Sequence, residues 1–314
     1  MIASGTIVGI DVSKEALDLW WYPEDRAWRC GYTDHELSAL VSELIQLQPS
    51  RVIVEATGGL ETRLVSELSA AGLPVVVVNP RQVRQFARAS GRLAKTDRLD
   101  AELLAHFGNA MRPPVRSLPD AALRELRDLV SRRRQLIAMQ TQERNRRRQA
   151  SHRIAEQIQQ HVDLLATQID QLDRDISALL NDNVHWRARA KLLRTIPGVG
   201  PALTASLIAQ LPELGQATHK EIASLAGVAP FNRDSGVMRG KRSVWGGRAP
   251  LRAVLYMAAL VATKCNPAIR SCYQRLCSVG KPRKVALTAC MRKLLIICNA
   301  VVKTSTPWNP SLSP

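Results

Sequence analysis

Residues 6–13 read TIVGIDVS, an apolar run that carries an aspartate at position 11. Residues 51–59, RVIVEATGG, repeat the arrangement, with Glu55 at the end of the run and a glycine pair behind it. Short apolar runs bounded by turn residues predict buried strands. Residues 95–107, KTDRLDAELLAHF, place Asp97 and Asp100 three residues apart, on one face of an expected helix start. Two strand ends and one helix start therefore each carry carboxylates.

The rest of the first third alternates between strand and helix patterns. We expect strands at 6–11, 16–22, 27–32, 51–55 and 74–79, and helices that begin near residue 33 and cover 60–71, 81–89 and 97–110. Three antiparallel strands followed by strand–helix–strand units is the order of a ribonuclease-H-like α/β domain. Pro113 and Pro114 mark its end, so this domain is predicted at residues 1–112.

The four carboxylates suggest metal-dependent phosphate chemistry. Carboxylates that converge on one sheet edge can hold two Mg²⁺ ions roughly 3.5–4 Å apart, which clamp the attacking and leaving oxygens of a phosphodiester. Without metal they would raise one another's pKa values. Any one of them could instead be only a cap or turn residue. Other acids lack such an arrangement and are expected at the surface: Asp18, Asp25, Glu61 and Glu102.

The net charge of +17 over 314 residues is unevenly distributed. Residues 1–112 sum to −2, residues 113–190 to +4 and residues 191–314 to +15. The carboxylate-bearing third is nearly neutral, while the last third has the electrostatic footprint of a nucleic-acid-binding protein. A merely well-solvated basic surface is the weaker interpretation, because the charge imbalance is large and the chain has no low-complexity tail that would account for it.

Cysteine spacing and hydropathy exclude several classes of protein. The six cysteines show no CxxC pair, so neither a zinc site nor a disulfide framework is expected, and they are interpreted as small apolar core residues. No signal-peptide pattern is present at the N-terminus. Arg292 and Lys293 interrupt the apolar stretch 285–302, which argues against a membrane span. We expect a soluble intracellular protein.

The middle segment, residues 113–190, predicts a long helical hairpin or coiled coil, because residues 119–181 are polar, periodic and nearly free of Gly and Pro. Such helices commonly mediate dimerisation. Two arginine clusters lie on it and could either follow a nucleic-acid backbone or form a solvated face. Their members are Arg132, Arg133, Arg134, Arg144, Arg146, Arg147 and Arg148.

Residues 191–314 are expected to be mainly helical. The stretch 192–211, LLRTIPGVGPALTASLIAQL, has the pattern of a helix–hairpin–helix element in which the turn around Gly198 and Gly200 could hold a DNA phosphate. The alternative is a tight helical hairpin whose glycines serve backbone geometry only.

A second cluster of functional residue types lies at 225–257, LAGVAPFNRDSGVMRGKRSVWGGRAPLRAVLYM. Ser235, in a basic Asp-Ser-Gly loop, could act as a nucleophile. From residue chemistry alone a structural turn is favoured, Ser243 is an equal candidate, and no base is evident. Trp245 could stack on a base, but core packing is expected. Cations here could bind the scissile phosphate: Arg239, Lys241, Arg242, Arg248 and Arg252.

The motifs together resemble the DEDD-type insertion-sequence transposases, the bridge-RNA-guided (seekRNA) recombinases of the IS-one-ten and IS-eleven-eleven class. The resemblance spans nearly the whole chain. It is carried by GIDVSK (9–14), VIVEATGG (52–59), KTDRLDA (95–101), IPGVGP (196–201), LAGVAPFNRDSG (225–236), LYMAALVA (255–262) and KVALTACMRKLL (284–295). The motifs RGKR (239–242) and WGGRA (245–249) resemble those of the seekRNA-using branch of this family.

The resemblance implies a RuvC-like first domain in which Asp11, Glu55, Asp97 and Asp100 bind Mg²⁺. It implies that Ser235, in a transposase domain at 191–314, attacks a DNA phosphate and forms a phosphoserine intermediate. It also implies dimers that pair into tetramers, with the RuvC-like domain of one subunit facing the Ser domain of another. A guide RNA would pair with donor and target DNA, in the prokaryotic cytosol or nucleoid and without any membrane.

Two other functions stay open at this point. A RuvC-like metal-dependent nuclease or junction resolvase would use water and no covalent Ser. A nucleic-acid-binding scaffold would have a degenerate site. The target and donor sequences cannot be derived from the chain, because a guide RNA would hold that information.

Overall fold

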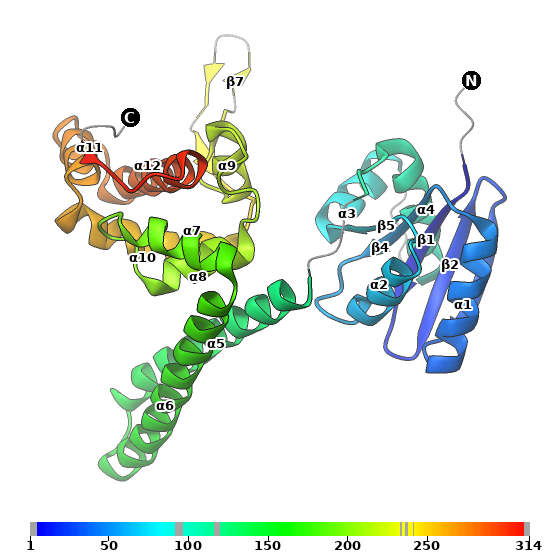
Figure 1. The fold of residues 1–314 in the computed structure, drawn as a ribbon, viewed down its shortest axis with the longest axis horizontal. Coiled ribbons are helices and arrows are strands. Elements are labelled where there is room, and N and C mark those ends of the chain that lie inside the picture. The colour runs from blue at the N-terminus through cyan, green and yellow to red at the C-terminus, as the bar shows by residue number, and fades with distance from the viewer. Residues whose placement is uncertain are drawn as a thin grey trace. The chain divides into compact units, whose positions relative to one another are not determined.

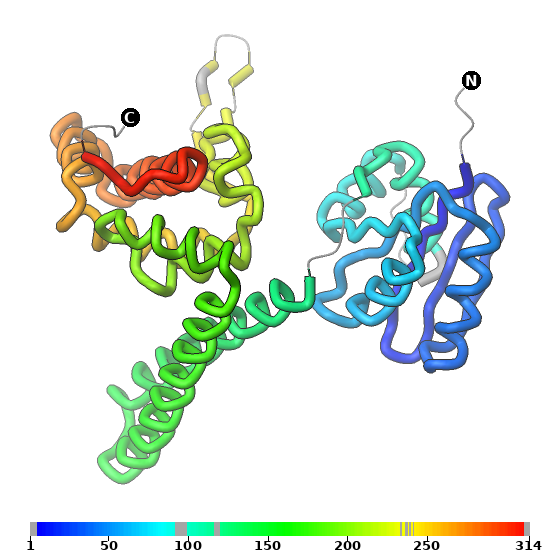
Figure 2. Tube along the Cα trace, viewed as in Figure 1, coloured from blue at the N-terminus to red at the C-terminus, as the bar shows by residue number. Residues whose placement is uncertain are grey.

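The computed structural model describes residues 5–91, 97–115, 120–232, 234–235, 238–240 and 242–310, without the side chains of Asp97, Arg98 and Arg239. The chain divides into two compact units, residues 1–119 and residues 120–314. Figure 1 shows the helices and strands of each unit, and Figure 2 follows the chain through them.

The first unit is built on a five-stranded mixed sheet with the strand order β3-β2-β1-β4-β5. β1 (Ile7–Val12), β2 (Ala16–Tyr22) and β3 (Arg26–Gly31) are antiparallel neighbours. β4 (Arg51–Glu55) and β5 (Val75–Val78) continue the sheet parallel to β1. The order and directions confirm the predicted arrangement of three antiparallel strands followed by strand–helix–strand units.

Helices α1 (Asp34–Leu47) and α2 (Glu61–Ala70) pack on one face of this sheet. The Thr33 hydroxyl accepts a hydrogen bond from the Glu36 N–H and caps α1 at its N-terminus. Alternate strand residues complete this layer of the core, together with apolar residues at helical spacing. The buried residues on this face include Val8, Ile10, Val52, Val54, Leu37, Leu40, Leu44, Leu64 and Leu68.

Helices α3 (Pro80–Ala89) and α4 (Asp97–Met111) cover the opposite face. Asn79 caps α3, and Pro80 occupies its first turn, where a missing N–H costs nothing. The residues of β1 and β4 that point to this side alternate with those of the first face. They pack with the two helices in a second core cluster that includes Ile7, Ile53, Val76, Leu104 and Phe107.

β1 and α4 approach so closely that Gly9 has no room for a side chain. A Cβ atom at Gly9 would lie 2.2 Å from the carbonyl oxygen of Ala101 and 2.5 Å from the amide nitrogen of Ala105. Further along α4, a Cβ at Gly108 would lie 2.9 Å from Cγ2 of Ile7. Gly9 follows Ile7 in the strand, whereas Gly108 follows Ala101 in the helix, so α4 runs antiparallel to β1.

The second unit begins with two long helices, α5 (Ala121–Arg147) and α6 (His152–Asp182), which pack against each other. They are the two helices predicted for residues 119–181. Leu136, Leu165 and Ile169 form a separate core cluster between them. Toward the other end of the pair, further apolar residues of both helices join the main core of the unit.

The remainder of the second unit is mainly helical, as predicted. Its helices are α7 (Val184–Arg194), α8 (Pro201–Gln210), α9 (His219–Leu225), α10 (Ala249–Cys265), α11 (Pro267–Ser278) and α12 (Arg283–Thr304). Two short antiparallel ladders lie between α9 and α10. They are β6 (Pro230–Phe231) with β9 (Ser243–Val244), and β7 (Asp234–Ser235) with β8 (Met238–Arg239).

Among the described residues, α12 is the one helix long and apolar enough to cross a membrane by length and composition. Of its most apolar window, 61% is buried inside the unit. Buried side chains from Ala286 to Val302 contact neighbouring helices of the main core. Burial on several sides is typical of the central helix of a globular core.

The six cysteines are free thiols. Burial raises the pKa of Cys298 to about 12, and burial also raises the pKa of Cys290 to about 12, with smaller contributions from neighbouring thiols. These two fit the expectation of small core residues that stay protonated. Cys265 is exposed on the last turn of α10, so the expectation of core packing is wrong for that residue.

Candidate functional site

Asp11 and Glu55 lie side by side at the ends of two parallel strands. The β1–β4 register pairs Gly9 with Ile53 and Ile10 with Val54, and its next step sets Asp11 beside Glu55. Neighbouring strands are about 4.8 Å apart. Gly9 and Ile53 face α4, and Asp11 and Glu55 lie two residues after them in their strands. Because strand side chains alternate, both acids point to the α4 side of the sheet. Both are half-buried.

The first turn of α4 lies near the same edge of the sheet. Ala101 contacts Gly9, and α4 runs antiparallel to β1, so residues before Ala101 lie beyond Gly9 in the direction of Asp11. Asp100 occupies this position and is half-buried. Asp97 begins the helix three residues earlier; its side chain lies outside the described residues. One close strand–helix contact thus brings the start of α4 near the strand ends that carry Asp11 and Glu55.

The donor set is suited to a hard divalent cation. Carboxylate oxygens are the ligands that Mg²⁺ takes in proteins. Within the part of the chain that the structure describes, no three His, Cys, Asp or Glu side chains lie close enough together to form a metal site by themselves. Asp97, the fourth predicted ligand, is not included in that search because its side chain is not described. The adjacency of Asp11 and Glu55 supports the fit.

Asp18 is a further carboxylate beside Asp11, and its predicted surface location is wrong. It stands directly opposite Asp11 in the antiparallel β1–β2 register, so the two side chains share one side of the sheet. Asp18 is only 8% exposed, and its Oδ1 lies 3.9 Å from Nε of Arg29 on β3. The burial follows from strand pairing.

The other acids set aside in the sequence occupy separate positions. Asp25 is exposed in the β2–β3 turn. Oε1 of Glu102 lies 3.5 Å from Nε2 of His106, one turn along α4. Glu61 instead fixes the connection that follows Glu55, because its Oε2 accepts from the amides of Thr57 and Gly59 at 3.2 and 2.8 Å. Burial raises the pKa of Glu61, but these hydrogen bonds outweigh it and hold the pKa below its ordinary value.

Replacing Gly9 by alanine is expected to displace α4 and with it Asp100. The new Cβ would overlap backbone atoms of Ala101 and Ala105, which cannot rotate away as a side chain would. Overpacking of this kind costs about 3 kcal/mol in the free energy of unfolding. Urea denaturation measures this cost. Gly200→Ala is the matched control, since a Cβ there meets nothing within 4 Å. Equal stability of both variants would contradict the close strand–helix contact.

Ser235 lies exposed on the outer ladder of a β-hairpin. Asp234 pairs with Arg239, and Ser235 pairs with Met238. Figure 1 shows the hairpin, labelled β7, extending away from the helices of its unit. No side chain among the described residues hydrogen-bonds the Ser235 hydroxyl, and Gly236 and Lys241 lie outside those residues. Ser235 is therefore exposed, and the described residues provide no hydrogen-bonded base beside it.

At the base of this hairpin, the backbone of Gly247 packs directly against the backbone at the end of α9. A Cβ at Gly247, which has a φ of +61°, would lie 2.3 Å from the amide nitrogen of Gly227 and 2.7 Å from the carbonyl oxygen of Leu225. Only glycine satisfies both the left-handed backbone and this backbone-to-backbone approach. The hairpin therefore projects from a fixed support.

Two of the predicted phosphate-binding cations, Arg248 and Arg252, make contacts within the chain near the base of the hairpin. Arg248 donates from both Nη atoms to the Glu213 carboxylate, each at 2.7 Å. Arg252 donates from Nη1 to the carbonyl oxygen of Gly246 at 2.6 Å. Arg248 and Arg252 therefore each have a partner within the chain close to the base of the hairpin. Arg242 is exposed and makes no hydrogen bond or ion pair within the described residues.

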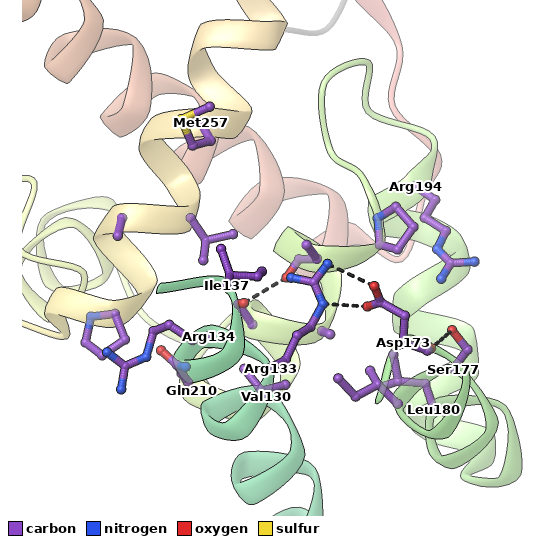
Figure 3. Close-up of a pocket in the computed structure, with 18 residues that line it drawn as sticks. Val130, Arg133, Arg134, Ile137, Asp173, Ser177, Leu180, Arg194, Gln210 and Met257 are labelled. Carbon is purple, nitrogen blue, oxygen red and sulfur yellow. Dashed lines mark hydrogen bonds and ion pairs between the residues drawn. The ribbon is translucent and has the colours of Figure 1, made fainter. Parts of the chain in front are cut away.

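The arginine clusters of α5 are not equivalent. Arg133 makes a bidentate pair with Asp173 of α6, with Nε–Oδ1 and Nη2–Oδ2 distances of 2.5 and 3.0 Å (Figure 3). Arg132 donates to Gln135, and Arg146 pairs with Glu143. The remaining members are exposed: Arg134, Arg144, Arg147 and Arg148. Arg133 therefore has a structural contact within the helix pair.

A cavity of about 300 Å³ adjoins the Arg133–Asp173 pair between α5, α6, α8 and α10 (Figure 3). Its walls are mostly apolar, with Ile137 and Met257 among them, and Arg134 and Arg194 also line it. Ser235, Asp11, Glu55 and Asp100 are not among its lining residues.

The turn before α8 meets a structural requirement at Gly198. Its φ is +93°, and a Cβ there would lie 2.6 Å from Cβ of Ala262 on α10. Packing against α10 thus accounts for this glycine. Gly200 caps α8, is exposed and has open space around it.

Trp245 is 53% exposed, so the expected core packing is wrong. Its ring contacts Phe231, with 5.7 Å between ring centroids and an interplanar angle of 56°. The sequence around Trp245 does not reveal the short β6–β9 ladder that the residue follows, so its exposure could not be predicted.

Comparisons with known proteins identify relatives over the whole chain. A family model described as "Transposase", for DEDD transposases of the IS110 type, matches residues 8–156. A second, "Transposase IS116/IS110/IS902 family", matches residues 190–274. The "Pilin gene-inverting protein" of Moraxella lacunata is 29% identical over 98% of both chains. An uncharacterised 42 kDa protein of insertion element IS900 from Mycobacterium paratuberculosis is 30% identical over 47% of this chain and 38% of its own.

Among solved structures, T. thermophilus RuvC in complex with Holliday junction substrate is similar over 34% of this chain and 95% of that chain, with 17% identity and a TM-score of 0.26. The first family model covers the unit that holds the carboxylates and continues through α5 to the start of α6, and the second lies within the unit that holds Ser235. The chain belongs to the IS110 family of insertion-sequence transposases and is a DNA transposase or recombinase.

Proposed function

We propose that this transposase cuts and rejoins DNA through a phosphoserine intermediate on Ser235, at sites chosen by a guide RNA. The observation that carries the proposal is the exposed Ser235 hydroxyl on an anchored hairpin, in a chain that also gathers carboxylates at one sheet edge.

In the proposed reaction, Ser235 Oγ attacks a backbone phosphorus and loses its proton. The bond from phosphorus to the 3′ oxygen breaks, the 3′-hydroxyl leaves with a proton, and the 5′-phosphate stays on Ser235. The 3′-hydroxyl of a swapped strand then attacks the phosphoserine and restores the Ser235 hydroxyl. One phosphodiester is lost and one is formed, so no external energy is required.

The carboxylates are proposed to serve Ser235 and the attacked phosphate. Asp11, Glu55, Asp97 and Asp100 would hold Mg²⁺. A bound divalent ion lowers the pKa of a coordinated hydroxyl and neutralises phosphate charge. This chemistry would supply the activation of the Ser235 hydroxyl that no base within the described residues provides. The two sets of residues lie in different units, and we assign the carboxylates and the serine of one reaction to different subunits, in a dimer that pairs into a tetramer.

RNA guidance is proposed for site choice. The charge of +15 over residues 191–314 supports backbone binding of a polyanion, as do the exposed arginines of α5. Structured RNA is recognised largely through backbone and shape, which such a surface can supply. Base pairing rather than side chains would then select donor and target DNA. The name of the Moraxella relative, a pilin gene-inverting protein, supports a protein that acts on DNA in the prokaryotic cytosol or nucleoid.

Mass spectrometry of the protein trapped with DNA, Mg²⁺ and the RNA from its own element tests the proposal. We expect a DNA-derived phosphate on the peptide that contains Ser235, and none on the peptide that contains Ser243. Strand cutting without an adduct would reject the phosphoserine route and favour a nuclease that uses water. Binding without any cutting would favour a scaffold with a degenerate site.

A further inference from the structure

We propose that Phe231 and Trp245 form a stacking platform for a base of the DNA strand that Ser235 attacks. This inference deepens the proposed function and rests on it for the identity of the strand. It concerns two side chains for which neither the carboxylates nor the serine provides a role.

The exposure of this pair is unusual for the chain. The sequence contains 3 Phe, 6 Trp and 4 Tyr. All of them lie within the described residues, and only Phe231 and Trp245 are exposed, at 39% and 53%. The two exposed aromatic rings are also each other's neighbours, 5.7 Å apart. Water-facing aromatic surface gathered at one place marks a binding site more often than a chance exposure does.

The hairpin holds the two rings in place before any ligand arrives. Phe231 pairs with Ser243 in the β6–β9 ladder, so Trp245 is the diagonal neighbour of Phe231 on the same face. The carbonyl of Gly246, next to Trp245, accepts from Arg252 at 2.6 Å. A tilt of 56° keeps the rings from stacking on each other, which leaves ring faces available.

The position of the pair points to the reacting strand. Phe231 precedes Ser235 by four residues, and four residues of extended chain span roughly 13 Å. A base stacked on the platform would therefore belong to a nucleotide within a few steps of the attacked phosphate. Both rings lie on the same hairpin as the nucleophile, so stacking would hold the strand in register with Ser235.

The surrounding charge favours nucleic acid over an apolar protein partner. Arg242 is exposed, immediately precedes β9, and makes no hydrogen bond or ion pair within the described residues. A cation beside an aromatic face suits a phosphate beside its base. A protein interface would more often carry charges of both signs, and Asp234 is the one acidic residue between 222 and 314.

The test measures binding of the full chain to a short single-stranded oligothymidylate, with no RNA and no cleavage site. Stacking is sequence-tolerant, so this probe suffices. Trp245→Ala is expected to weaken binding by about 5- to 150-fold, and Phe231→Ala to weaken it in the same direction. Trp245→Phe keeps a ring, so it should bind within a few-fold of the natural chain while losing the tryptophan quenching that the oligonucleotide causes.

Salt dependence separates stacking from charge. The slope of log affinity against log salt should be unchanged in Trp245→Ala, because no phosphate contact is removed, and shallower by about one in Arg242→Gln. Val279→Ala, an exposed apolar residue on another part of the unit (63% exposed), is the matched control and should bind normally. Equal affinity of Trp245→Ala and the natural chain would overturn the platform. A change in oligomeric state by light scattering would overturn it too, because the pair would then be a protein contact.

The platform and the proposed function can fail separately. If oligothymidylate quenches Trp245 but Ser235 never acquires a phosphate, the platform stands as a DNA-binding element and the phosphoserine route falls. If Ser235 forms the adduct equally well in Trp245→Ala at limiting DNA, the reaction stands and the platform falls. Thermal melting of Trp245→Phe and Phe231→Tyr should match the natural chain, since both rings are exposed.

Discussion

Ser235→Ala is expected to abolish strand cutting and the protein–DNA adduct together, with a loss of about 10⁴- to 10⁶-fold. The substitution removes the only atom that can carry the phosphate in the proposed reaction. Ser235 is exposed and its hydroxyl has no hydrogen bond within the described residues, so its removal leaves no buried partner unsatisfied. Stability and DNA binding should therefore stay close to those of the natural chain. Gel assays of labelled DNA measure cutting and adduct in one experiment.

Ser243→Ala provides the matched control. Ser243 lies on the same hairpin, is equally exposed, and was an equal candidate when judged by residue type alone. It pairs with Phe231 at the base of the hairpin, whereas Ser235 lies on the outer ladder. Its variant should retain cutting. Loss of activity in Ser243→Ala with retention in Ser235→Ala would transfer the nucleophile to Ser243.

The fold of the first unit follows from local sequence to an unusual degree. Each predicted strand and helix of this unit is present, with ends that differ by a residue or two, because the runs around Ile10, Ile53 and Val76 are apolar and bounded by strong turn residues. The strand order could also be predicted, since hairpins and right-handed crossovers leave few alternatives. Sequence did not reveal how closely α4 approaches β1, because Gly9 reads equally well as a weak strand residue.

The candidate site could be predicted where one residue type at a strand or helix end was enough. Asp11 and Glu55 are of this kind, and their adjacency required only a parallel register. The burial of Asp18 could not be predicted, because it depends on the pairing of β2 with β1, which sets Asp18 opposite Asp11. The exposure of Trp245 could not be predicted, because strands of two residues show no hydrophobic periodicity. An aromatic residue beside such a strand looks the same in sequence as a core residue.

Charge runs predict a surface but do not identify the cations that are free to bind a ligand. Arg133 and Asp173 are far apart in sequence and meet only through the packing of α5 on α6. Arg248 and Glu213 meet in the same way across the main core. Each pairing gives the arginine a partner within the chain, which composition cannot show. Arg134, Arg144, Arg147, Arg148 and Arg242 are the exposed cations left by this criterion.

Asp11→Asn is expected to reduce Mg²⁺-dependent cutting by about 10³-fold or more, because an amide is a poorer ligand for a hard cation and leaves one negative charge fewer. Asp18→Asn is the matched control. It makes the same change on the same face, directly opposite Asp11, but Asp18 lies next to Arg29. Its variant should retain activity within about tenfold. An equal loss in both variants would bring Asp18 into the metal set.

Mixing the two inactive variants distinguishes a shared site from a self-contained one. If the carboxylates of one subunit serve the serine of another, a mixed dimer of Asp11→Asn and Ser235→Ala contains one site with both natural sets, and cutting should return. If each subunit supplies its own carboxylates and serine, every site in the mixture lacks one set and cutting stays absent. Persistent absence, in a mixture shown by light scattering to have exchanged subunits, would reject sharing between subunits. It would leave the phosphoserine reaction untouched, because the adduct on Ser235 of the natural chain tests that step independently.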